Sequence, residues 1–284
     1  MSAYDRSPLV EIYDALRPLN ASWMADVGPP SGGGWIAGSD LRTATAGPLN
    51  ELLTQIGERM RAPNDRLTIA ALFALRYGWA SAMAIAPYLK YGCVPDVSLE
   101  NISLKFREST FLERTAIHAS RGVMVADDPR ADHPSITTVA DGHALLRALR
   151  STLTAQAAPV VEALYEWSGF SRRGTWGQLT SSWASHFTTL QAGERDQRTL
   201  VPLIQEFLAG DDLVAAMQPG LHAVTYGDVT QLFQRRASCC RWYLLPQGEL
   251  CASCPLVSHE DRLARNLAWM QKQLDPPREK RGHA

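Results

Sequence analysis

Apolar residues recur along this chain mostly at helical spacing. Leu9, Ile12 and Leu16 lie three to four positions apart, which predicts an amphipathic helix over Pro8–Leu16. Residues 67–86 are apolar on nearly all sides, so they are predicted to form one central core helix. Pro159 is interpreted as the start of a new helix, because proline is tolerated in a first helical turn. The other predicted helices cover residues 49–60, 141–158, 159–167, 175–190, 197–208 and 259–275.

Two of these helices carry capping signals. Thr175 is followed three residues later by Gln178, which fits a capping box and predicts that a helix begins there. Ser258 is a suitable N-cap for the last helix, and the tail over residues 278–284 is expected to fray. The core-facing side of the last helix is predicted to consist of Leu263, Leu267, Met270 and Leu274.

Short stretches with alternating polarity interrupt the helical pattern. Residues 97–106 alternate apolar with polar side chains, Gly122–Val125 is a candidate partner strand, and residues 221–226 form a third candidate. The fold class predicted is therefore α+β. We expect an α-rich body with a small β-sheet over residues 1–215, and a small C-terminal module over residues 216–284.

Composition narrows the class of protein. The 284 residues are 45% hydrophobic and 20% charged, as in ordinary soluble globular proteins. The net charge of −1 argues against general nucleic-acid binding. Arg76 interrupts the longest apolar run, so a buried helix is expected and no transmembrane segment. The N-terminus lacks a basic stretch followed by an apolar core, so we expect a cytoplasmic protein, free or peripheral to the inner face of the membrane.

Four of the five cysteines lie within sixteen residues, at Cys239, Cys240, Cys251 and Cys254. In a reducing compartment clustered cysteines are more often metal ligands or redox groups than disulfides. Four thiolates can surround a soft metal centre such as zinc or an iron–sulfur cluster. Cys93, which stands alone, is predicted to be a small buried residue.

Three chemistries compete for these four cysteines. Zinc usually takes two Cys-x2-Cys knuckles, and only Cys251 and Cys254 form one. A binuclear iron–sulfur cluster tolerates adjacent Cys239 and Cys240 more easily, because its ligands are divided between two irons. A thioredoxin-like thiol pair should open a helix after a strand, whereas Cys251 follows a Pro-Gln-Gly-Glu loop and Cys254 precedes Pro255.

The pattern Arg236-x-Ser-Cys-Cys-x-x-Tyr243, followed by Pro246, Gly248 and Cys-x2-Cys-Pro, resembles the C-terminal signature of the FhuF-like ferric-siderophore reductases. The resemblance implies that Cys239, Cys240, Cys251 and Cys254 hold a 2Fe–2S cluster. Looser similarities lie in the body, at Arg76-Tyr77, residues 94–99, Trp176-Gly177 and Ser181-Ser182.

The resemblance implies that one electron passes from the cluster to a chelated Fe(III), releasing Fe(II). The expected substrate is a ferric siderophore, of hydroxamate type, and the expected electron donor is a separate flavoprotein or ferredoxin. Helix N-termini with basic residues suit anions and carbonyl oxygens. The candidate substrate residues are Arg172, Arg173, Trp176, Arg76 and Arg241. The alternative is a zinc-stabilised siderophore-binding or scaffold protein without redox activity.

Overall fold

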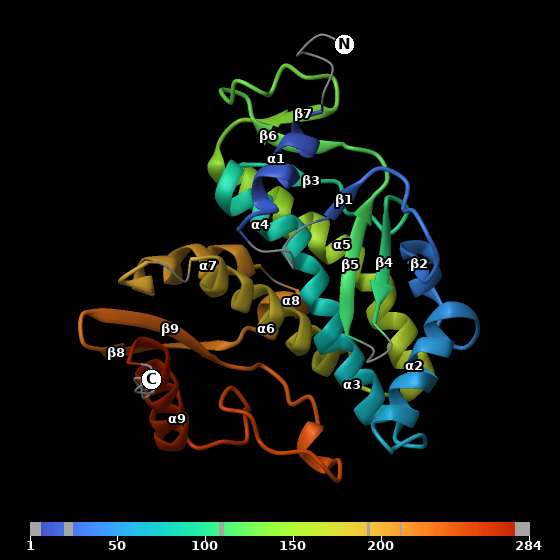
Figure 1. Cartoon of the computed structure of the whole chain (residues 1–284), viewed down its shortest axis with the longest axis vertical. Helices are drawn as coiled ribbons and strands as arrows, with labels where there is room; N and C mark the ends of the chain where they lie inside the picture. Colours follow the sequence, from blue (N-terminus) through green and yellow to red (C-terminus); the bar gives the residue numbers. More distant parts are fainter. Residues whose placement is uncertain (1–6, 20–24, 108–110, 192–193, 211, 276–284) are drawn as a thin grey trace, which may run out of the picture.

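The computed structural model describes residues 7–19, 25–107, 111–191, 194–210 and 212–275. Within them the chain is mixed α+β, as predicted: three central helices pack side by side, and small sheets lie around them (Figure 1). The central helices are α3 (Arg66–Tyr77), α5 (Gly142–Ser168) and α6 (Arg172–Leu190). The remaining helices are α1 (Pro8–Leu16), α2 (Gly47–Arg59), α4 (Ala82–Tyr91), α7 (Leu200–Leu208), α8 (Leu213–Ala216) and α9 (His259–Leu274), with short 3₁₀ turns η2 (Gly38–Arg42), η3 (Gly78–Ser81), η4 (Gln197–Thr199) and η5 (Trp242–Leu244).

Three sheets are present among the described residues. The first orders its strands β1-β5-β4-β2, the second β3-β6-β7, and the third is the antiparallel hairpin β8-β9. Their bounds are β1 (Ala25–Val27), β2 (Trp35–Ala37), β3 (Val94–Pro95), β4 (Ile102–Phe106), β5 (Leu112–Ile117), β6 (Gly122–Val125), β7 (Ile136–Val139), β8 (Gly220–Tyr226) and β9 (Val229–Arg235).

Helix α5 corrects the prediction made at Pro159. The proline does not start a helix but lies inside one continuous helix of 27 residues. Proline leaves the carbonyl four residues earlier without its helical donor. That residue, Ala155, is exposed, so its carbonyl can bind water, while Leu153 and Val160 on either side are buried. Packing of the long helix therefore outweighs the one lost hydrogen bond.

The predicted core helix over residues 67–86 is two helices, α3 and α4, joined by η3. Gly78 begins η3, and a β-carbon there would lie 2.6 Å from the hydroxyl of Ser182 on α6. The close approach of α6 explains why this position is a glycine. The combined run Arg66–Tyr91 is long and apolar enough to cross a membrane by length and composition, yet 89% of its apolar window is buried inside the protein. This agrees with the predicted buried helix.

The predicted strands are partly right. Strand β4 starts only at Ile102, because Asn101 closes a turn by donating to the carbonyls of Asp96 and Ala119. Strand β6 has the predicted bounds but pairs with β3 and β7. Strand β4 lies between β5 and β2, neither of which was predicted. Strand β8 lies where it was predicted, and its partner β9 was not predicted.

The last part of the chain contains the β8-β9 hairpin, the cysteine-bearing loop and α9, which packs on β8 (Figure 1). Ser258 caps α9 as predicted, by accepting a hydrogen bond from the amide of Asp261 at 3.0 Å. The predicted apolar face is wrong in part, because Leu274 is 41% exposed. The buried residues of α9 are Arg262, Asn266 and Met270. The domain boundary near residue 215 stays a prediction, and the predicted tail 278–284 lies outside the described residues.

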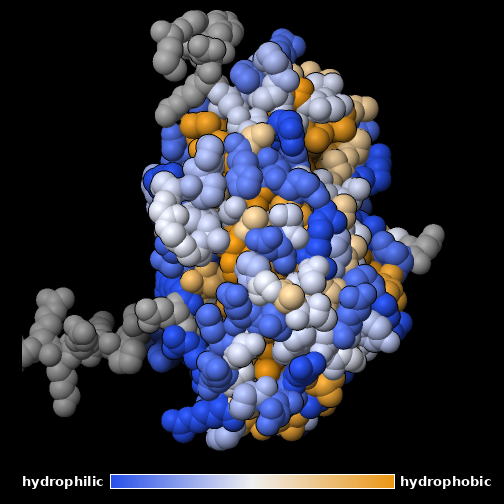
Figure 2. All heavy atoms as spheres, turned by 90° about the vertical axis from the view of Figure 1, so that its right-hand side faces the viewer, coloured by the Kyte–Doolittle hydropathy of each residue, from blue (hydrophilic) through white to orange (hydrophobic). Residues whose placement is uncertain are grey.

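Polar side chains dominate the face seen in Figure 2, where apolar residues form small separate patches. Such scattered exposure is normal for a folded chain.

Candidate metal centre

The loop after β9 folds back so that its two ends meet. The amide of Arg236 donates to the carbonyl of Ser253 at 2.8 Å, and the amide of Cys254 donates to the carbonyl of Cys251 at 3.0 Å. These bonds place the sulfur of Cys239 4.0 Å from the sulfur of Cys254. Cysteines fifteen positions apart in sequence are thus neighbours in space.

This sulfur pair fits the ligation of one metal ion. Two sulfurs at tetrahedral positions about 2.3 Å from a metal lie about 3.8 Å apart. Among the described residues, no group of three or more His, Cys, Asp or Glu side chains is arranged to hold a metal ion. In a binuclear cluster each iron needs only two protein sulfurs, so a paired arrangement is compatible with the donor set of 2Fe–2S.

Two of the four cysteines, Cys240 and Cys254, are buried, whereas Cys239 and Cys251 are partly exposed. Cys240 is 8% exposed and packs in a small apolar cluster with Leu72 and Leu245. The backbone amide of Arg241 donates to the sulfur of Cys239 at 3.3 Å. Burial raises the pKa of the Cys239 thiol to about 11. A bound metal keeps such a thiol deprotonated and thereby offsets the cost of burying a thiolate.

Helix α6 supports the first half of the loop. The Ser238 hydroxyl donates to the carbonyl of Gly174 at 2.7 Å and accepts from the side-chain amide of Gln178 at 2.8 Å. The amide of Ala237 donates to the hydroxyl of Ser181 at 3.1 Å. A β-carbon on Gly177 would lie 2.8 Å from the Ser238 side chain. The loop can approach α6 this closely because residue 177 is glycine.

Replacing Ser238 by alanine should therefore loosen this support. The Gln178 amide, buried on α6, would lose its acceptor, at a cost of about 1–2 kcal/mol, and the melting temperature should fall by about 2–4 °C. A thermal unfolding curve of the full chain measures the effect. The matched control is Ser151→Ala, at an exposed serine of α5, which should leave the melting temperature unchanged. An equal shift in both variants would contradict the assigned role of Ser238.

Helix α3 supports the middle of the loop through Arg241. This residue adopts the left-handed conformation, with φ of 61°, and its Nε donates to the Thr68 hydroxyl at 3.0 Å. Its guanidinium also lies 4.0 Å from the carboxylate of Asp65, which caps the N-terminus of α3. Arg241 thus joins the cysteine loop to the body.

The predicted arginine pair at residues 172 and 173 belongs to the first turn of α6 rather than to the segment before it. The helix is capped by Ser171, whose hydroxyl accepts from the amide of Gly174, so the predicted start at Thr175 is wrong. Thr175 is buried inside the helix, where its hydroxyl turns back to the carbonyl of Ser171. The first turn of α6 lies beside the cysteine loop, because Gly174 contacts Ser238.

The two arginines of that turn differ in their surroundings. Arg172 donates to both carboxylate oxygens of Glu162, at 2.8 and 2.7 Å, and its guanidinium lies 3.8 Å from the centre of the Tyr165 ring. Arg173 is exposed. Of the pair, Arg172 is already held by side chains of α5.

Two other predicted substrate residues lie in the interior of the body. Trp176 is 6% exposed and packs edge-on against Trp183, with 6.1 Å between ring centres. Arg76 is buried, its guanidinium lies 4.3 Å from the ring centre of Phe111, and burial lowers its pKa to about 10. Both residues are therefore packed within the helical body.

The sequence reading missed the polar groups that support the loop. Ser238 was visible as part of the Ser-Cys-Cys motif, but its role depends on Gln178 and Gly174, which lie about sixty residues earlier. Arg262 was not predicted, because the leucine pattern of α9 predicts a different buried face. Its signal was the i, i+4, i+8 spacing with Asn266 and Met270.

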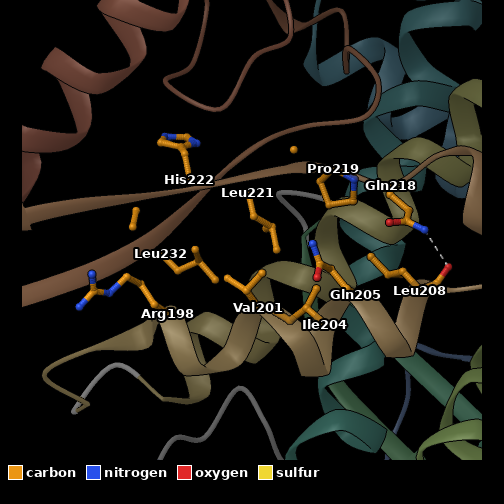
Figure 3. Close-up of a pocket in the computed structure, with 12 residues that line it drawn as sticks. Arg198, Val201, Ile204, Gln205, Leu208, Gln218, Pro219, Leu221, His222 and Leu232 are labelled. Carbon is orange, nitrogen blue, oxygen red and sulfur yellow. Dashed lines mark hydrogen bonds between the residues drawn. The ribbon is translucent and has the colours of Figure 1, made fainter.

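A cavity of about 310 Å³ lies away from these residues, between α7 and the β8-β9 hairpin (Figure 3). Val201 and Ile204 of α7 face Leu221 and Leu232 of the hairpin across it, whereas His222 points to the other side of the hairpin (Figure 3). None of the predicted site residues lines this cavity.

Comparison with known families gives two matches. A family model described as "FhuF 2Fe-2S C-terminal domain" matches residues 236–256, which include all four clustered cysteines. A second, described as "Ferric iron reductase FhuF-like transporter", matches residues 71–220, slightly more than half of the chain. A search of curated proteins gave no match. The 2Fe–2S match favours an iron–sulfur cluster over the zinc alternative.

Proposed function

This chain belongs to the FhuF-like ferric iron reductase family and carries its 2Fe–2S C-terminal domain, and on that premise we propose that it reduces the iron of a ferric siderophore. Cys239, Cys240, Cys251 and Cys254 hold the cluster in this proposal. When bound, the 2Fe–2S cluster supplies one electron to the chelated ferric ion. The product is ferrous iron, which hard oxygen ligands hold less tightly than ferric iron.

The observation that carries this proposal is the pairing of Cys239 with Cys254 at 4.0 Å. The loop that joins them is held against α6 through Ser238 and against α3 through Arg241. An electron carrier needs ligands that move little between redox states, and this anchoring supplies them. No proton-transfer residue is required, because reduction of Fe(III) to Fe(II) consumes only an electron.

We propose that the substrate binds beside the first turn of α6, which contacts the cysteine loop. Arg173 is exposed there and free of the Glu162 pairing that engages Arg172. A guanidinium and helix amides can bind the oxygen atoms of a hydroxamate siderophore. Trp176 and Arg76 are buried in the body, so neither touches the substrate in this proposal.

The electron must come from outside the chain in this proposal. A separate flavoprotein or ferredoxin is the class of donor that supplies single electrons to such a cluster. We propose the cytoplasm as the compartment, because a reducing environment keeps cysteines available as ligands. The cluster held by the four cysteines would be reduced by the donor and then oxidised by the ferric siderophore, in alternation.

The test is chemical analysis of anaerobically purified protein, followed by a single-turnover reaction. We expect two irons and two acid-labile sulfides per chain, and an electron paramagnetic resonance signal of one unpaired electron after dithionite reduction. After removal of excess dithionite, mixing with a ferric hydroxamate should bleach the signal and release one Fe(II) per cluster, trapped by a ferrous chelator.

Two results would contradict the proposal. Purified protein that contains stoichiometric zinc and no inorganic sulfide would favour the alternative, a zinc-stabilised scaffold without redox activity. A reduced cluster that persists in the presence of ferric hydroxamates, ferric catecholates and ferric citrate would show that the chain is not a ferric-chelate reductase.

A further inference from the structure

Arg262 on α9 is buried behind the second half of the cysteine loop. Its side chain is 2% exposed, and its Nη2 donates to the carbonyls of Cys254 at 2.9 Å and Val257 at 2.7 Å. These bonds connect α9 to the turn that carries Cys254. The sequence reading assigned no role to this residue.

The charge of Arg262 is not matched by the groups it contacts. In the described part of the chain its two hydrogen bonds go to carbonyl oxygens, and its buried Nε has no hydrogen-bond partner. A buried cation is strongly unfavourable unless an anion compensates it.

A 2Fe–2S cluster with four thiolates is such an anion. Two ferric ions, two sulfides and four thiolates sum to a net charge of about −2, and the reduced cluster carries about −3. Cys254, whose carbonyl accepts a hydrogen bond from Arg262 at 2.9 Å, is one of the proposed ligands. The cation and the expected anion therefore occupy neighbouring positions.

We propose that Arg262 is the buried counter-charge of the cluster, which raises the reduction potential and holds the Cys254 turn in place. The inference rests on the ligand set of the proposed function. The reduced cluster has one more negative charge than the oxidised one, so a fixed cation stabilises it more. Arg262 is a positioning and tuning residue and does not touch the substrate.

The position of Arg262 is fixed by the rest of α9. One turn further along, the side-chain amide of Asn266 lies 2.9 Å from Nε2 of His222 on β8. In Figure 3 the His222 ring lies on the opposite side of β8 from Val201 and Ile204, and α9 packs on β8. The hairpin thereby sets how far α9, and with it the guanidinium, lies from the cysteine loop.

The test compares reduction potentials of the holoprotein and three variants at one pH and ionic strength. Arg262→Gln removes the charge and keeps hydrogen-bonding capacity, whereas Arg262→Lys keeps the charge. The matched control is Arg265→Gln: Arg265 lies on the same helix and donates to the carbonyl of Leu250 in the same loop at 2.6 Å, but it is exposed. Potentiometric titration followed by absorbance and electron paramagnetic resonance measures each potential.

We expect Arg262→Gln to lower the equilibrium constant for reduction about tenfold, a shift of about 59 mV to more negative potential. Arg262→Lys should stay close to the native potential. Arg265→Gln should also stay close, because water and salt screen an exposed charge.

An unchanged potential in Arg262→Gln overturns the inference, and so does a drop in Arg262→Lys as large as that in Arg262→Gln. If Arg262→Gln cannot retain the cluster, retention in Arg262→Lys supports the charge role, and loss in both variants overturns it. Native protein that lacks acid-labile sulfide would instead refute the proposed function, so the two failures are distinguishable.

Discussion

Cys254→Ser is expected to abolish the cluster and to reduce the rate of ferric-siderophore reduction by about 100-fold or more, since even the loss of groups that only orient metal ligands costs 10–100-fold. Cys254 is 3% exposed and its sulfur neighbours that of Cys239, so a serine oxygen there would replace half of a sulfur pair. Iron and sulfide content, the visible absorbance and the reduction rate measure the loss. The body should stay folded, with an unchanged far-ultraviolet circular dichroism spectrum from its helices.

The fifth cysteine supplies the control for this prediction. Cys93 is fully buried in the body, and burial raises the pKa of its thiol to about 12. Cys93→Ala should cost about 1 kcal/mol of folding free energy, through a small cavity, and should leave iron and sulfide unchanged. Full iron content in Cys254→Ser would remove Cys254 from the ligand set, and iron loss in Cys93→Ala would show that the site is placed wrongly.

Gly248→Ala is expected to disrupt the cysteine loop at a cost of about 3 kcal/mol. A β-carbon at this position would lie 1.7 Å from the carbonyl oxygen of Trp242 and 2.7 Å from its carbon. Both are backbone atoms, so no side-chain movement can relieve the clash. The turn from Trp242 to Gly248 would have to open, which would displace Cys251 and Cys254 relative to Cys239. Iron content and the melting temperature should both fall.

Gly220→Ala is the matched control for this prediction. Gly220 lies at the start of β8, and the nearest contact of a β-carbon there is an ordinary 3.7 Å to the side chain of Arg235. This variant should bind iron like the native protein. Equal iron content in Gly248→Ala and Gly220→Ala would mean that the tight turn is not needed to bring the cysteines together.

Local patterns were reliable where one residue or one face determines the structure. The helix Pro8–Leu16 was predicted to the residue, because its apolar face is regular and its proline is in the first turn. Ser258 was identified as an N-cap because capping is a contact within three residues. The strands were harder: β5 and β9 were not predicted, although each pairs with the strand that precedes it in the chain.

The errors at Pro159 and Thr175 have a common physical cause. In both cases a local preference competed with packing between helices. A proline is tolerated in α5 because the buried residues around it compensate for one missing hydrogen bond. The cap of α6 is Ser171 rather than Thr175. Thr175 is buried within the helix, where α6 packs against the core.

The sequence by itself determined which donor atoms are available at the site: four cysteines within sixteen residues supply sulfur, because donor type is a property of residue type. Only the tertiary structure decided which groups surround them. It brought the loop residues Ser238 and Arg241 into contact with α6 and α3, respectively. It also placed the uncompensated charge of Arg262 behind the loop. These contacts join residues far apart in the chain, and their energies depend on burial and distance, which no local pattern encodes.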